Sequence, residues 1–246
     1  MRILISNDDG IYSPGLAALA TVAMRFGEVV IVAPDVEQSS TSQAITSSRP
    51  ISYRKTAIPG FEAYRVNGTP SDCVALGALN GGPIDLVLSG INLGENLGNG
   101  IWYSGTVAAA KQAALLNIRG LAFSMPVGEA DKEPAFPLIL PWVEKALVLL
   151  LAHPDLRLVN VNIPTAARGM RWTRQSCRQY DGKIVPSSDP MGRKNFWYTV
   201  TPITGAEEGT DRWAMANNFV SLTPLRLDLT DERLLEDAAK RHPLEG

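Results

Sequence analysis

Histidine and cysteine are scarce in this sequence, which has only His153, His242, Cys73 and Cys177. One histidine follows a predicted helix and the other is nearly terminal, so we expect neither histidine phosphatase chemistry nor a Ser-His-Asp triad. The two cysteines lack the spacing of a metal site and cannot form a disulfide framework. This usage is typical of a reducing compartment, and we expect a cytoplasmic protein.

Long apolar runs and an excess of basic charge are also missing. No stretch approaches the roughly 18 apolar residues that span a bilayer, and the N-terminus enters a strand at once instead of a secretory signal. The net charge is −2 at pH 7, which argues against a nucleic-acid polymer as partner. The glycine motifs of P-loops, dinucleotide sites and nucleophile elbows do not occur either. We therefore expect neither a membrane nor a nucleic-acid partner.

What the sequence does contain is an alternation of apolar strands and helical segments through its first two thirds. Because repeated β-α-β units build a parallel sheet with helices on both faces, this pattern predicts an α/β fold. The predicted strands are 2–6, 28–33, 62–66, 85–89, 120–124 and 156–163, and the predicted helices are 14–26, 70–79, 104–117 and 136–152.

The composition changes after Pro164. Residues 168–204 are rich in aromatics, glycine and proline and predict β-hairpins, and a terminal helix is predicted over 227–241, starting near Thr230. With no linker or repeat, we expect one domain of residues 1–246, with a core of 1–165 and an extension of 166–246. The apolar residues of this extension predict a homodimer or homotetramer formed through it.

Polar residues follow the predicted strands where ligands bind in open α/β sheets, beyond the carboxyl ends. Asp8 and Asp9 follow the first strand, Ser39 lies in the loop after the second, and Asn92 and Asn96 follow the strand 85–89. This oxygen-rich set suits Mg²⁺ or Mn²⁺, and two adjacent carboxylates are costly without a cation. The alternative is that Asp8 caps a turn and that the other side chains are solvated or form turns.

The segment Ser104, Gly105 and Thr106 begins an alanine-rich helix. Free N–H groups at a helix N-terminus bind anions, and Gly105 allows close backbone approach. Plain N-capping is the alternative explanation. If the first interpretation holds, a phosphate site and a metal site are neighbours, as phosphoryl transfer requires.

Taken together, these residues resemble the SurE family of metal-dependent 5′-nucleotidases, also described as stationary-phase survival proteins. The resemblance covers nearly the whole chain. It rests on ILISNDDGIYSPGL, APDVEQSSTSQAIT, VNGTPSDCVALG, LVLSGINLGENLGNGIWYSGTVAAAKQAA and EEGTDRWAMANNFVSLTPLRLDLT.

The resemblance implies a Rossmann-like core and hydrolysis of nucleoside 5′-monophosphates, with 3′-monophosphates or short polyphosphate as further substrates. Ser40 and the pair Asn217–Asn218 depart from the family pattern, where glycine or another small residue is common. Asp8 is our candidate to orient or deprotonate the attacking water. The implied site has one divalent metal per subunit on Asp8, Asp9, Ser39 and Asn92, with Asn96, Ser104, Gly105 and Thr106 beside the phosphate.

Two alternatives are non-catalytic. A receiver-type signalling module also has an acidic pair after its first strand, but it needs an aspartate after the third strand and a lysine after the fifth. This chain has Asn67–Gly68 and Ser124–Met125 there. A Mg²⁺-dependent nucleotide-binding protein without turnover stays open. Among other phosphatases, the haloacid-dehalogenase type requires Asp-x-Asp, where this chain has Asn7 before its acidic pair.

Overall fold

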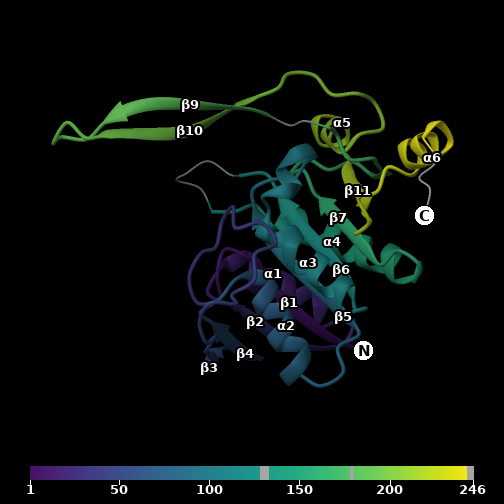
Figure 1. Ribbon diagram of the computed structural model, residues 1–246. Helices are drawn as coiled ribbons and strands as arrows, with labels where there is room; N and C mark the ends of the chain where they lie inside the picture. The colour runs from purple at the N-terminus through teal and green to yellow at the C-terminus, as the bar shows by residue number, and fades with distance from the viewer. Residues whose placement is uncertain (128–132, 178–179, 243–246) are drawn as a thin grey trace.

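A nine-stranded sheet organises the computed structural model, which describes residues 1–127, 133–177 and 180–242 (Figure 1). The strand order is β3-β4-β2-β1-β5-β6-β7-β11-β8. Neighbouring strands from β4 to β7 are all parallel, whereas β3 and β11 pair antiparallel with β4 and β7. The strands are β1 (Arg2–Ser6), β2 (Glu28–Pro34), β3 (Tyr53–Ile58), β4 (Phe61–Val66), β5 (Leu86–Leu93), β6 (Arg119–Met125), β7 (Leu158–Asn162), β8 (Met170–Trp172) and β11 (Val220–Pro224).

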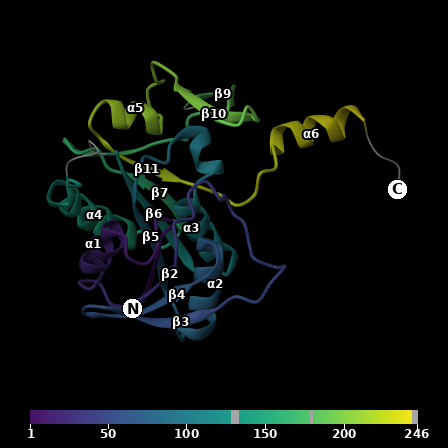
Figure 2. The same ribbon diagram turned by 90° about the vertical axis from the view of Figure 1, so that its left-hand side faces the viewer.

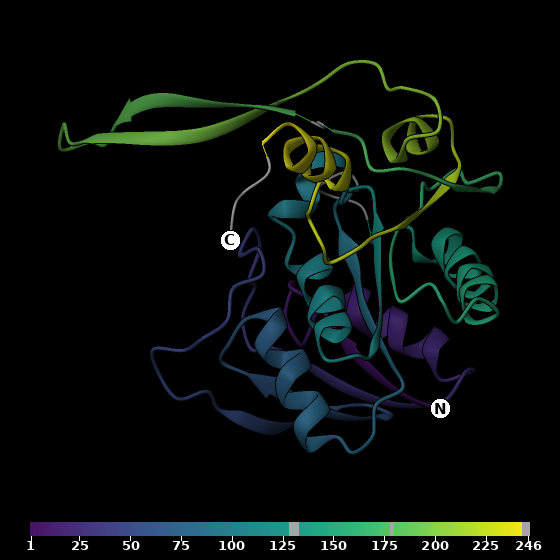
Figure 3. The same cartoon turned by 45° about the vertical axis from the view of Figure 1, so that its right-hand side comes forward.

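Helices cover both faces of this sheet, as Figures 2 and 3 show. One apolar cluster joins the sheet to α1 and α4, and a second joins it to α2 and α3. This arrangement confirms the predicted α/β fold with a mostly parallel sheet. The helices are α1 (Pro14–Ala23), α2 (Pro70–Asn80), α3 (Gly105–Leu115), α4 (Phe136–Leu151), α5 (Asp211–Ala216) and α6 (Glu232–Arg241), and a short 3₁₀ helix, η1, spans Gly98–Trp102. None of the helices in the described ranges is both long and apolar enough to cross a membrane.

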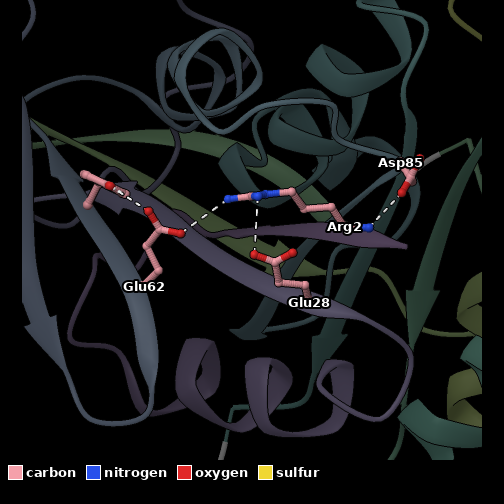
Figure 4. Close-up of polar contacts among 5 residues, drawn as sticks. Arg2, Glu28, Glu62 and Asp85 are labelled. Carbon is pink, nitrogen blue, oxygen red and sulfur yellow. Dashed lines mark hydrogen bonds and ion pairs between the residues drawn. The ribbon is translucent and has the colours of Figure 1, made fainter.

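Arg2 fastens the amino end of β1 to its neighbours, at the end of the sheet away from the strand exits (Figure 4). Its guanidinium lies 3.3 Å from Glu28 of β2 and 3.3 Å from Glu62 of β4, and its backbone N–H donates to Asp85 at 2.7 Å. These contacts hold the start of β1 against β2, β4 and the residue before β5.

The sequence analysis did not predict β3, β11 or α5, and β8 lies within 168–204, where it predicted β-hairpins. The strand β3 lies at the sheet edge with several exposed residues, so it lacks the apolar run that marks the inner strands. The strands β8 and β11 extend the sheet beyond β7, so part of the 166–246 segment completes the core sheet. The division at residue 165 stays a prediction.

Two other parts of that segment, a β-hairpin and α6, extend away from the sheet, whereas α5 packs beside β11 (Figures 1 and 2). The strands β9 (Tyr180–Ser188) and β10 (Lys194–Pro202) pair antiparallel as one long hairpin. The terminal helix begins at Glu232, close to the predicted start near Thr230, and the side chain of Asp231 is its N-cap, accepting from the Leu234 amide at 2.9 Å.

Candidate functional site

The strand order reverses beside β1, with β2 on one side of it and β5 on the other. In open α/β sheets the crevice beyond the carboxyl ends of two such strands binds ligands. Asp8 and Asp9 follow β1 after the single residue Asn7, and Asn92 lies near the end of β5. The topology therefore brings together residues that are more than eighty positions apart in the sequence.

The turn after β1 presents both aspartates. Gly10 has a φ of 97°, a conformation that favours glycine, and the Asn7 side chain donates to the Gly10 carbonyl at 3.1 Å. The backbone carbonyl of Asp8 accepts from the Gln38 amide at 2.7 Å. This bond places the loop that carries Ser39 beside the aspartates.

The carboxylate of Asp8 is buried against the N-terminus of α3. The Thr106 hydroxyl donates to Asp8 Oδ1 at 2.5 Å, and the amides of Thr106 and Gly105 also donate to it. A Cβ atom on Gly105 would lie 2.9 Å from Asp8 Oδ2, so only glycine leaves room here. Burial raises the pKa of the Asp8 carboxyl, while these hydrogen bonds oppose the increase.

The N-terminus of α3 thus binds an acidic group, but this group is the side chain of Asp8 and not a bound phosphate. Thr106 is fully buried, and its hydroxyl donates its hydrogen bond to Asp8 in this structure. The Ser104 hydroxyl accepts from the Val107 amide at 3.0 Å, which is N-capping. That bond uses the Ser104 oxygen as an acceptor and leaves its O–H able to donate. Contact of Gly105 and Thr106 with a phosphate stays a prediction.

Asp9 lies in an environment that disfavours its charge. Burial, followed by the charges of Asp8 and Glu37, raises its pKa from 3.8 to about 7, against a weaker opposing bond from the Leu93 amide. Its Oδ2 atom is buried without a hydrogen-bond partner. An unpartnered buried carboxylate oxygen is costly unless a cation binds it.

The two remaining predicted ligands complete an oxygen-rich set. The Ser39 hydroxyl donates to Glu37 Oε1 at 2.6 Å, which turns its lone pairs away from that acid. The Asn92 amide nitrogen donates to the Gly94 carbonyl at 2.7 Å and leaves the side-chain oxygen available. Ser40 has a φ of 60°, a conformation for which glycine is better suited.

These groups surround one cavity of about 350 Å³. Glu37, Glu95 and Tyr103 also line it, although the sequence analysis gave them no role. Gly105 and Thr106 lie behind Asp8 and are not part of the lining. The predicted site residues that do line the cavity are Asp8, Asp9, Ser39, Asn92, Asn96 and Ser104.

The donor atoms of this cavity fit a hard divalent cation. Across the described ranges, no three side chains among histidine, cysteine, aspartate and glutamate come together as a metal-binding group. A cation here would therefore need the Ser39 hydroxyl and the Asn92 amide oxygen beside the two carboxylates. All four donors are oxygens, as Mg²⁺ and Mn²⁺ prefer.

The loop between β5 and α3 is fixed by residues from distant elements. The Asn96 carbonyl accepts from the side chains of Asn160 and Asn162 at 2.7 and 3.1 Å, and the Asn96 side chain donates to Ser124 at 2.9 Å. The Gly98 amide donates at 2.8 Å to Asp211, which is fully buried at the start of α5. The sequence analysis gave no role to the residues that hold this loop. Asn160, Asn162 and Ser124 lie in predicted strands, and Asp211 lies in one of the motifs that resemble the known family.

We expect the free energy of unfolding of the metal-free protein to fall as the pH rises from about 4 to about 7. The folded state keeps a proton on Asp9 up to about pH 7, whereas the unfolded chain releases it near 3.8. More protons are then bound to the folded state in this window, so stability decreases with pH. Denaturant unfolding in EDTA should show this slope for the wild type and a shallower slope for Asp9→Asn. Equal slopes for the two proteins would contradict the assignment.

The chain matches known proteins over most of its length. Residues 3–182 match the family model described as survival protein SurE. A protein of Thermus thermophilus named 5′-nucleotidase SurE 1 is 46% identical over 242 residues, covering 96% of both chains. The 5′-nucleotidase SurE of Deinococcus radiodurans is 40% identical over 251 residues, covering 98% of this chain and 93% of that one.

A solved structure agrees with these sequence matches. The crystal structure of the SurE protein from Aquifex aeolicus superimposes with a TM-score of 0.82 at 37% identity, covering 98% of this chain and 99% of that one. Both the sequence and the fold therefore agree over nearly the whole length, and this chain belongs to the SurE family.

Proposed function

We propose that this chain is a 5′-nucleotidase that hydrolyses nucleoside 5′-monophosphates to nucleoside and phosphate with the help of a divalent metal. The observation that carries the proposal is the charge of the site cavity. Its charged side chains, among the residues described, are the four acids Asp8, Asp9, Glu37 and Glu95. A phosphate dianion would be repelled by them unless a cation lay between, and this matches the activity named for the relatives.

We assign one Mg²⁺ or Mn²⁺ per subunit to Asp8, Asp9, Ser39 and Asn92. When bound, such an ion offsets charge on the phosphoryl group and lowers the pKa of a coordinated water. The unpartnered Oδ2 of Asp9 and the raised pKa of its carboxyl support this assignment, because a cation relieves both.

The chain's own residues then orient the reactants. Asp8 orients or deprotonates the attacking water, and its position is fixed by the Thr106 hydroxyl and the α3 amides. Asp9 acts mainly as a ligand. The Ser104 hydroxyl lines the cavity with its proton free to donate to a phosphate oxygen, and Asn96 borders the same space. Precise placement of this kind supplies much of the rate enhancement in phosphoryl transfer.

Purified protein should release phosphate from nucleoside 5′-monophosphates in the presence of Mg²⁺ or Mn²⁺, and EDTA should abolish the release. A panel of 5′- and 3′-monophosphates and short polyphosphate, each with both metals, would define the substrate and the preferred ion. Full activity after exhaustive chelation would refute the metal assignment. Binding of the nucleotide with metal but without turnover would favour the non-catalytic alternative.

We further propose a homodimer or homotetramer formed through the C-terminal extension. The described residues of α6 include none that is buried, and Leu229, Leu234 and Leu235 are all more than half exposed. On the hairpin, Phe196 and Trp197 are each 66% exposed. So much unpacked apolar surface on two protruding elements is expected to be covered by a partner.

Truncation after Pro224 should shift the assembly toward the monomer, because it removes α6 while leaving β11 and the four assigned ligands in place. Light scattering at micromolar concentration measures the mass directly. If the truncated protein assembles with the same number of subunits as the full-length protein, α6 does not form the interface. A full-length chain that is monomeric would refute oligomerisation altogether.

We also propose a cytoplasmic location. The two cysteines, Cys73 and Cys177, are free thiols in the structure, as expected in a reducing compartment.

A further inference from the structure

A second cavity of about 350 Å³ adjoins the site cavity, and the two share Glu95 as a lining residue. Its other walls come from the loop after β5 and from the C-terminal segment that holds α5. This volume is in the range of small-molecule sites, roughly 300–1,000 Å³. No part of the chemistry described above uses it.

The walls of this cavity differ from those of the metal site. Leu97 and Met215 present apolar side chains and are nearly buried, and Ala206 and Ala216 leave space between them. The Arg212 guanidinium donates to the Ile203 carbonyl and so fixes the loop that forms one wall to α5. At the opposite wall, α5 is tied to the site loop by the bond between Asp211 and the Gly98 amide. The cavity is therefore preformed and has both apolar and polar walls, with the Glu95 carboxylate at its boundary and the Arg212 side chain among its lining residues.

We propose that this second cavity binds the nucleoside half of the substrate, with the ribose at Glu95 and the base against Leu97 and Met215. The proposal rests on the proposed nucleotidase function and specifies which part of the protein recognises the substrate beyond its phosphate.

The order of groups in a nucleotide supports this arrangement. The sugar lies between phosphate and base, and Glu95 lies between the metal site and the second cavity, since it lines both. A carboxylate accepts hydrogen bonds and suits the hydroxyl groups of a ribose, which are donors. The faces of a base are suited to the apolar walls beyond.

The alternative position for the base is beside Tyr103, which is 49% exposed and lines the metal-site cavity. A base stacked on Tyr103 would leave the second cavity empty. Substitutions that fill the second cavity separate these two arrangements.

The test compares adenosine 5′-monophosphate with ribose 5-phosphate, which lacks the base. Ala216→Trp and Ala206→Phe each fill the cavity, one from α5 and the other from the facing loop. We expect each to lower the ratio of kcat/KM for the nucleotide to kcat/KM for the sugar phosphate by roughly 10-fold or more, as loss of a binding pocket should. Ala17→Trp, at an exposed position on α1, is the matched control and should leave the ratio unchanged.

The role of Glu95 is tested with adenosine and 2′-deoxyadenosine 5′-monophosphates. We expect the wild type to prefer the ribonucleotide by roughly 10-fold, the effect of a hydrogen bond to a charged acceptor, and Glu95→Ala to remove that preference. An unchanged nucleotide-to-sugar ratio in both cavity-filling variants would overturn the base site, and no ribose preference in the wild type would overturn the Glu95 contact. No phosphate release from any substrate would instead refute the proposed function itself.

Discussion

Asp8→Asn and Asp9→Asn should each lower kcat/KM for a nucleoside 5′-monophosphate by more than about 100-fold. Loss of a residue that only supports a metal ligand typically costs roughly 10–100-fold, and these two carboxylates are assigned to the metal itself. As the assigned ligands, they would also provide the negative charge for a divalent cation beside the neutral donors Ser39 and Asn92. Metal affinity measured by calorimetry should fall together with activity.

Both variants should fold, because each removes one of two repelling carboxylates from a buried site. Asp155→Asn removes an exposed acid from the turn before β7 and is the matched control, which should keep full activity. Near-normal turnover in either site variant would remove that aspartate from the site. Lost turnover with normal metal affinity in Asp8→Asn alone would support its assignment to water activation.

Gly105→Ala should lower kcat by about 100-fold, although Gly105 does not line the cavity. The added Cβ would lie 2.7 Å from the Asp8 Cβ and 2.9 Å from its Oδ2, so the carboxylate must move. A displacement of about 1 Å in a catalytic group can cost about 100-fold in rate. The measurement is kcat at saturating metal, so that weaker metal binding is separated from misplacement of Asp8.

Gly169→Ala is the matched control for this substitution. A Cβ atom at Gly169 meets the Phe219 ring at 3.4 Å, which is an ordinary van der Waals contact, so activity should be retained. Normal kcat in Gly105→Ala would mean that Asp8 tolerates the shift and does not act on the water. A thermal midpoint close to that of the wild type would show that any loss is local to the site.

The sequence was sufficient for the inner sheet and for the residue types of the site. The strands β1, β2 and β6 are mostly apolar and β5 begins with an apolar run, because both faces of the inner sheet are covered, and such runs are visible without a structure. β7 (LVNVN) is apolar only at alternate positions after its first residue. The ends of these strands are equally visible, so the acidic pair and the asparagines that follow them could be assigned to one edge of the sheet.

Elements with weaker local patterns could not be found in this way. The edge strand β3 has several exposed residues, and β11 is a short segment whose place beside β7 depends on pairing with a strand about sixty residues earlier. Pairing of this kind is decided by the assembled sheet. β11 does alternate apolar and polar residues over VSLT, a strand signal that the sequence analysis did not use, whereas β3 (YRKTAI) has no such alternation. The sequence also leaves open the position of α6.

By itself, the sequence determined which chemistry is available: oxygen donors after β1, β2 and β5, with no histidine among them. Only the tertiary structure decided which groups meet. Thr106 reaches Asp8 across 98 residues and Asp211 reaches Gly98 across 113, so the start of α3 holds a carboxylate and α5 supports the site loop. Hydrogen bonds between distant segments depend on strand order and on helix packing over the sheet. Local periodicity reveals neither the strand order nor the helix packing. It indicates which residues are buried, but it does not indicate which residues they contact.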